Sequence, residues 1–134
     1  MPYDLRTVDI GRGEPFEPSF LAISPNNRRP AIIDPDGPDG APISVFESGA
    51  IRQYLARKSG RFGGDAPREQ VTVSEWLFWQ MGGLGPMAGQ AHHFRLSAPE
   101  KIPYAIDRDA NEVNRLFGVM NKLLASHEAC VGWV

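Results

Sequence analysis

Glu47 and Ser48 stand where a short apolar run ends and a helical pattern begins, a position suited to binding a small zwitterion. Ser48 is a candidate N-cap, because a serine hydroxyl at that position accepts a hydrogen bond from an amide of the first turn. Those amides and the positive end of the helix dipole also favour an anion such as a carboxylate. Glu47 would then pair with an ammonium group on the same ligand. The alternative is that Ser48 only caps the helix and Glu47 only solvates its start.

His92 and His93 could bind a metal ion, and Trp76, Phe78 and Trp79 could line a substrate pocket. Neighbouring residues on a helix, however, point about 100° apart, and no carboxylate or cysteine stands at ligand spacing from the two histidines. We therefore expect no metal. We expect the three aromatic side chains to belong first of all to the hydrophobic core.

Two apolar runs and a helix must position Glu47 and Ser48. The first run, residues 30–34, opens with a proline, which cannot donate to a strand ladder and can follow a cis peptide bond. A Gly/Pro-rich turn over residues 35–42 leads into a second strand over residues 43–46. The helix that follows has apolar side chains at the i, i+3, i+4 spacing and a glycine where a C-cap belongs, namely Ile51, Tyr54, Leu55 and Gly60.

The rest of the chain predicts one more strand and three helices. Alternation over residues 3–10 predicts a half-buried strand, and residues 16–23 a short helix. A long helix should begin near Pro67 and run towards His92, and another should cover residues 104–125. The first of these contains residues that predict a kink or a close backbone approach, namely Gly82, Gly83, Gly85 and Pro86. The second has an apolar stripe of Ile106, Ala110, Val113, Leu116, Phe117, Met120 and Leu124.

The composition limits the classes of partner. The chain has 134 residues, 42% of them hydrophobic, which is enough for one domain of ordinary size or two shortened ones. A net charge of −2 gives no excess that would favour nucleic acid or an anionic membrane. Cys130 is the one cysteine, so no disulfide can form within the chain. No apolar run approaches the length of a membrane span and no signal segment opens the chain, so we expect a cytoplasmic location.

The order strand, Gly/Pro-rich turn, strand, Glu-Ser and helix resembles the second half of a thioredoxin-like glutathione-binding domain. The chain resembles the cytosolic glutathione transferases, and among them the bacterial nu-class group of glutathione-dependent disulfide-bond oxidoreductases. The likeness runs from Pro2 to about Glu128, and it is carried by residues 24–34, 46–51, 76–94 and 99–108.

The resemblance implies an α/β domain followed by an all-α domain, both shortened. Residues 1–60 would form a partial thioredoxin-like domain whose first strand and helix are missing. Residues 67–134 would form part of the all-helical C-terminal domain. In the family the loop after the first strand carries the Thr or Asn that activates the glutathione sulfur. The catalytic residues therefore stay unknown, and we expect this chain by itself to have little or no activity.

The resemblance also assigns glutathione contacts to Arg28, Arg29, Glu47, Ser48 and Arg108. Glu47 and Ser48 would bind the γ-glutamyl end. Arg29, the residue before the expected cis proline, would pair with the cysteinyl part through its backbone, although the family prefers Val or Ile there. Burying its charged side chain would be unfavourable by about 1–3 kcal/mol. Arg28 would meet the glycyl carboxylate, unless it is simply solvated, and Arg108 would contact glutathione from the helical domain.

The activity implied is conjugation of glutathione to a small electrophile, or reduction of a disulfide with glutathione, by a homodimer without a metal. Both reactions need the glutathione thiolate, since thiolate and not thiol is the nucleophile. The alternative is a non-catalytic glutathione-binding or interaction module, including an inactive fragment of a transferase gene. A metal hydrolase that uses His92 and His93 is a weaker third hypothesis.

Overall fold

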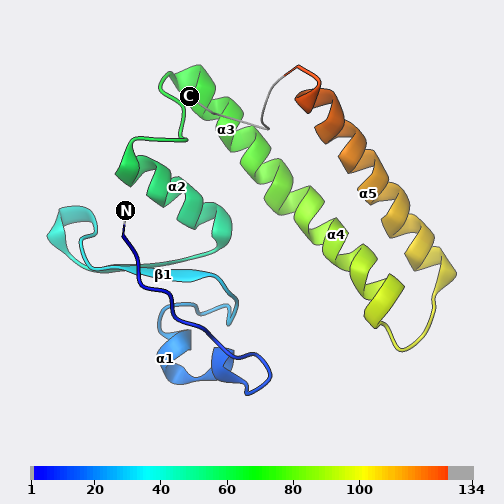
Figure 1. The fold of residues 1–134 in the computed structure, drawn as a ribbon, viewed down its shortest axis with the longest axis horizontal. Coiled ribbons are helices and arrows are strands. Elements are labelled where there is room, and N and C mark those ends of the chain that lie inside the picture. The colour runs from blue at the N-terminus through cyan, green and yellow to red at the C-terminus, as the bar shows by residue number, and fades with distance from the viewer. Residues whose placement is uncertain (1, 127–134) are drawn as a thin grey trace. The chain divides into compact units, whose positions relative to one another are not determined.

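The computed structural model describes residues 2–126. The chain divides into two compact units, Met1–Lys58 and Ser59–Val134 (Figure 1). The first unit holds a two-stranded sheet with short helical turns before it and one longer helix after it. Its elements are η1 (Glu14–Phe16), α1 (Pro18–Leu21), β1 (Ala31–Asp34), η2 (Pro38–Gly40), β2 (Ile43–Phe46) and α2 (Ser48–Ser59).

The two strands form an antiparallel sheet in which Ala31 pairs with Phe46. Both strands are rich in isoleucine and valine, whose branched side chains favour extended backbone. The turn between them closes through Gly37, whose amide donates to a backbone carbonyl across the turn at 3.1 Å. The expected strand, turn and strand are confirmed. They bring the end of β2 directly to the start of α2.

Helix α2 buries its apolar face through Ile51, which is 7% exposed. The first backbone bond of the helix runs from the Ile51 amide to the Glu47 carbonyl oxygen at 2.9 Å. The helix ends at Ser59, and Gly60 follows with φ 64°, a left-handed conformation that glycine adopts with little strain. The expected helix and its glycine C-cap are confirmed.

The expected strand over residues 3–10 is wrong. No strand forms there, and the side chains of Tyr3 and Leu5 are 84% and 81% exposed. A strand needs a neighbour for its ladder, and in the described residues the sheet contains β1 and β2 only. The helix expected over residues 16–23 is shorter than predicted, because within that range only α1 (Pro18–Leu21) is α-helical. The 3-10 turn η1 precedes it, and each of the two has a proline in its first turn.

The second unit is helical, with α3 (Pro67–Trp79), η3 (Gln80–Leu84), α4 (Gly85–His92), η4 (His93–Ser97) and α5 (Pro103–Leu124). The elements from α3 to η4 follow one another without a break, as the periodic pattern predicts (Figure 1). The expected interruption takes the form of a π-helical turn, in which the Gly85 amide donates to the Gln80 carbonyl oxygen. Helix α3 begins at Pro67, as expected, and α5 begins at Pro103, one residue before the expected start.

Helix α5 packs against η3 and α4 (Figure 1). Leu116 is 2% exposed, and Gly83 lies against it, since a Cβ added to that glycine would be 3.7 Å from a Leu116 methyl carbon. The expected stripe is only partly buried, because Phe117 and Leu124 are 47% and 39% exposed. Asp109 is buried on this face instead. None of the helices in residues 2–126 combines the length and the apolar character needed to cross a membrane.

Candidate functional site

A pocket in the first unit lies where the loop before β1 meets the end of β2 and the start of α2. Its lining combines two arginines, a carboxylate and two serines, a set of side chains that suits a ligand with charges of both signs. The lining residues are Ser24, Arg28, Arg29, Pro30, Phe46, Glu47 and Ser48. All of the expected binding residues of the first unit are therefore brought together.

Ser24 holds the loop that brings the arginines to the pocket. Its side chain is fully buried, and its hydroxyl donates to the Arg28 carbonyl oxygen at 2.7 Å. The Asn27 amide donates to the Ser24 carbonyl oxygen at 2.9 Å, and Asn27 takes a positive φ of 49°. Asparagine tolerates that conformation better than most residues. We did not expect this role for Ser24, because the sequence pattern placed it only after the end of the short helix expected over residues 16–23.

Glu47, and not Ser48, occupies the N-cap position of α2. Glu47 has φ 67°, outside the helical region, while its carbonyl oxygen already accepts the first helical bond from Ile51. Ser48 is the first residue of the helix. The Asn26 side-chain amide donates to Glu47 Oε1 at 3.3 Å and helps to orient the carboxylate. Glu47 and Ser48 thus lie side by side at the positive end of a helix of 12 residues.

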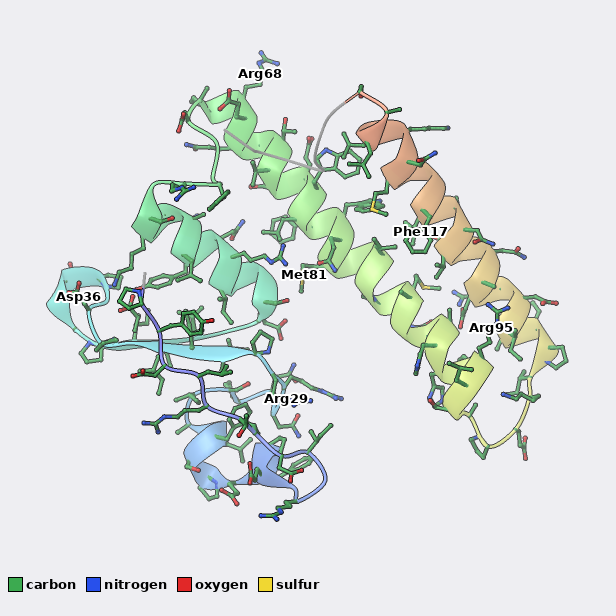
Figure 2. All side chains as sticks on the ribbon, in the orientation of Figure 1. Arg29, Asp36, Arg68, Met81, Arg95 and Phe117 are labelled. Carbon is green, nitrogen blue, oxygen red and sulfur yellow. The ribbon has the colours of Figure 1, made fainter. Side chains whose placement is uncertain are left out.

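Arg29 precedes a cis peptide bond to Pro30, as expected. Its side chain is exposed and donates from Nη1 to the Val8 carbonyl oxygen at 3.3 Å (Figure 2). The unfavourable burial that the sequence suggested therefore does not arise. Among residues 2–126, no hydrogen bond uses the Arg29 backbone amide or carbonyl. These two groups can pair with an extended peptide that enters the pocket.

A cluster of polar side chains joins the end of β1 to the second half of α2, at the end of the hairpin ladder opposite the pocket. Asp34 accepts hydrogen bonds from Lys58 Nζ, at 2.6 Å, and from the Tyr54 hydroxyl. The bonds from Lys58 and Tyr54 lower the pKa of the Asp34 carboxyl, and the same carboxylate raises the pKa of Lys58 and of Tyr54. Sequence reasoning missed this cluster, although Tyr54 and Lys58 stand four residues apart on one helix face.

Arg108 lies on α5 in the second unit. Its Nη1 donates to Asp109 Oδ1 at 2.6 Å, and its side chain is 56% exposed. The glutathione contact expected for Arg108 stays a prediction.

The expectation that Trp76, Phe78 and Trp79 belong to the core is wrong for Phe78, whose side chain is 66% exposed, because it does not share the helix face of Trp76 and Trp79. In residues 2–126, no group of three or more His, Cys, Asp or Glu side chains could hold a metal ion. His92 and His93 are exposed, and Trp76 packs edge-on against Trp79 with ring centroids 5.3 Å apart. Cys130 lies outside the described residues.

Known proteins resemble this chain in sequence and in structure. Residues 1–57 match the family described as glutathione S-transferase, N-terminal domain. Disulfide-bond oxidoreductase YfcG of Escherichia coli is 54% identical over 125 residues, which cover 92% of this chain and 58% of that protein. Disulfide-bond oxidoreductase YghU of the same organism is 39% identical, over 97% of this chain and 44% of that protein.

Solved structures agree with these sequence matches. A glutathione transferase from Pseudomonas putida, with one glutathione disulfide bound per subunit, is 39% identical with a TM-score of 0.94 and covers 98% of this chain and 58% of that one. A glutathione transferase from Burkholderia graminis, with two glutathione molecules bound per subunit, is also 39% identical, with a TM-score of 0.95, over 98% and 56% of the two chains.

The chain spans roughly half the length of these relatives, between 44% and 58% of each. Within that span, the sequence match and the structural match cover nearly all of the 134 residues. The expected fold class, a thioredoxin-like unit followed by a helical unit, is confirmed by both. Residues 1–57 thus match the glutathione S-transferase N-terminal domain, and the chain as a whole is similar in sequence and structure to glutathione transferases.

Proposed function

We propose that this chain binds glutathione in the pocket of the first unit, as part of a glutathione-dependent transferase or disulfide-bond oxidoreductase. The observation that carries the proposal is that the pocket gathers Arg28, Arg29, Glu47 and Ser48. The glutathione bound in relatives of known structure supports the same ligand class.

Each charged group of glutathione has a residue of opposite charge or a hydrogen-bond donor to pair with in this pocket. Its γ-glutamyl end carries both an ammonium group, for the Glu47 carboxylate, and a carboxylate, for the Ser48 hydroxyl and the start of α2. Its cysteinyl part can pair with the Arg29 backbone as an added strand would. The Arg28 side chain, which is exposed at the pocket, can meet the glycyl carboxylate. Arg108 on α5 is a further glutathione contact that the family resemblance implies.

The chemistry implied is attack by the glutathione thiolate. On a disulfide, the thiolate sulfur forms a new bond to one sulfur, the old bond breaks, and the other sulfur leaves as a thiolate. A second glutathione thiolate can then attack the mixed disulfide, releasing the second substrate thiolate and giving glutathione disulfide. On a small electrophile, the same thiolate would form a carbon–sulfur bond and displace a leaving group. A non-catalytic glutathione-binding module stays the alternative, because none of the five binding residues is assigned to the glutathione sulfur.

Three further features belong to the proposal. The protein would act as a homodimer, would take a small electrophile or a disulfide as its second substrate, and would work in the cytoplasm. We also propose that residues 1–60 and 67–134 correspond to the two domains of the family.

Calorimetric titration of the full chain with glutathione tests the proposal. We expect Ser48→Ala to weaken binding by roughly fivefold to tenfold, because one hydrogen bond to a charged group is lost. Ser44→Ala is the matched control, since Ser44 lies on the exposed face of β2 and does not line the pocket. If the Ser48 variant and the parent chain bind glutathione with equal affinity, glutathione does not bind at the start of α2, and the proposed site is wrong.

A further inference from the structure

A buried carboxylate on α5 contacts the arginine that the proposed function uses. The Asp109 side chain is 1% exposed, and its Oδ1 accepts a hydrogen bond from Arg108 Nη1 at 2.6 Å. The Arg108 side chain is 56% exposed. One partner of this ion pair is therefore fixed inside the helical unit, while the other remains accessible to a ligand.

Stability of the helical unit alone does not account for a carboxylate at this position. Asp109 is buried on the same helix as Leu116, on the side that packs in the unit. Its Oδ2 is buried and has no hydrogen-bond partner among residues 2–126. A buried polar atom without a partner is unfavourable, and replacing a buried ion pair by apolar side chains is often neutral or stabilising. The carboxylate therefore calls for a role beyond packing.

The pair restricts where the Arg108 guanidinium can go. Successive residues on a helix point about 100° apart, so Arg108 must fold along the helix surface to reach its neighbour. A charge-assisted bond to a buried, immobile carboxylate then limits the rotamers of a long side chain that solvent would otherwise leave free. A guanidinium has five N–H donors, and the bond to Oδ1 uses one of them. The remaining donors stay available for a carboxylate on a ligand.

We propose that Asp109 is a positioning residue that holds the Arg108 guanidinium in the orientation that binds a carboxylate of glutathione. The inference rests on the proposed function, because it needs Arg108 to be a ligand contact. Binding gains from such an arrangement, since the ordering of the arginine is already complete before the ligand arrives.

A double-mutant cycle in the full chain, titrated with glutathione by calorimetry, tests the inference. We expect Asp109→Asn to weaken binding by roughly threefold to tenfold, and Arg108→Ala by at least as much. The double variant should bind no more weakly than Arg108→Ala alone, because Asp109 acts through Arg108. Asp107→Asn and Arg115→Ala are matched controls, since Asp107 is exposed beside Arg108 and Arg115 pairs with Glu112.

Each other outcome of the cycle overturns the inference. Losses that add in the double variant would show that Asp109 acts on binding independently of Arg108. Unchanged affinity in Asp109→Asn, with binding still sensitive to Ser48→Ala, would refute the positioning role and leave the proposed function standing. A parent chain that binds no glutathione would refute both.

The apolar variant Asp109→Leu separates a loss of glutathione binding from a loss of folding. It should melt at the same temperature as the parent chain or higher, while binding glutathione as weakly as Asp109→Asn does. If both variants lose their helical circular dichroism, Asp109 has a structural role and the positioning role is refuted.

Discussion

At the scale of single residues, the pocket of the first unit depends on a backbone conformation at Glu47 that the sequence does not predict. Glu47 has φ 67° without being glycine, a conformation that is uncommon for such a residue and unfavourable by about 1 kcal/mol or more. Strain of this kind persists where the surrounding structure fixes it, and it gathers at binding sites. Here it turns the Glu47 carboxylate and the Ser48 hydroxyl to the same pocket.

The same conformation explains why the helix start was predicted one residue too late. Serine is a preferred N-cap and glutamate is not, so composition favours Ser48 at that position. In the structure, Glu47 takes it because its positive φ ends the strand at once. The sequence named four of the residues that line the pocket, Arg28, Arg29, Glu47 and Ser48, but it did not predict which of Glu47 and Ser48 occupies the N-cap position.

The Asp34 cluster makes the stability of the first unit depend on pH. The Asp34 pKa is lowered in the folded chain from its ordinary value of 3.8, mainly by Lys58, so the cluster contributes stability above that value. That contribution is lost as the pH falls through the lowered pKa. We predict that Asp34→Asn lowers the melting temperature near neutral pH, and that the difference from the parent chain shrinks below about pH 4.

Thermal melting at several pH values checks this prediction. Asp39→Asn is the control, because Asp39 lies in the turn between the strands and asparagine tolerates its positive φ of 60°. A difference between Asp34→Asn and the parent chain that is constant across the acid range would show that the carboxylate charge is not responsible.

At the scale of elements, local signals predicted the structure well where an element forms its bonds within itself or with its sequence neighbour. The hairpin of β1 and β2, and the start of α3 at Pro67, are of this kind. The strand expected over residues 3–10 is not, because its pairing depends on a partner elsewhere. An alternating pattern indicates which face of a strand can be buried, but it does not supply that partner.

The buried face of α5 was predicted only in part, for a different reason. Reading apolar residues alone placed Phe117 and Leu124 on the buried face and overlooked Asp109. A charged residue is rarely fully buried unless it is paired, so no pattern of hydrophobicity could have found it. The adjacent Arg108 could have indicated that Asp109 is paired, but the sequence alone does not show that the two side chains form an ion pair.

The glycines of the helical unit differ in how much its stability depends on them. Gly64 has φ 83°, and a Cβ added there would lie 2.8 Å from the backbone nitrogen of Gln70 in the first turns of α3. Gly82 lies in η3, and a Cβ there would meet nothing within 4 Å. We predict that Gly64→Ala destabilises the helical unit by about 1 kcal/mol or more, whereas Gly82→Ala stabilises it by about 0.5–1 kcal/mol.

Urea unfolding monitored by helical circular dichroism measures both changes. The two variants add the same methyl group, so an effect of alanine itself cancels in their comparison. Stabilisation by both would mean that the loop before α3 adapts to the added carbon, and that its left-handed turn is not required.

At the scale of the whole molecule, few large apolar side chains are buried. Among residues 2–126 the buried ones are Ile51 and Leu116, one in each unit, together with the smaller Pro15 in the first unit. Several large apolar side chains remain more than half exposed, including Val71 and Phe78 on α3 at 58% and 66%. An exposed apolar surface of this kind indicates contact with another protein surface. Homodimer formation, proposed above, would cover it.

We predict that the chain associates through the helical segment over residues 76–94, and that Phe78→Glu weakens this association. Phe78 is better suited to the test than Met81 or Leu84, which are half-buried and whose replacement by a charge would disturb packing within the unit. A carboxylate buried at an interface would lose its hydration and gain no partner, so the dissociation constant of the dimer should increase by about tenfold or more. Sedimentation velocity over a range of protein concentrations measures the change.

Phe117→Glu is the matched control, because Phe117 is also exposed, at 47%, but lies on α5. Two outcomes oppose the prediction in different ways. A parent chain that sediments as a monomer at high micromolar concentration would show that the exposed apolar surface is tolerated in water. Equal dissociation in both variants would instead move the interface away from residues 76–94, because the added charge would then act wherever it is placed on the helical unit. Dissociation in Phe78→Glu alone would assign the contact to α3, since the two variants differ in position and not in chemistry.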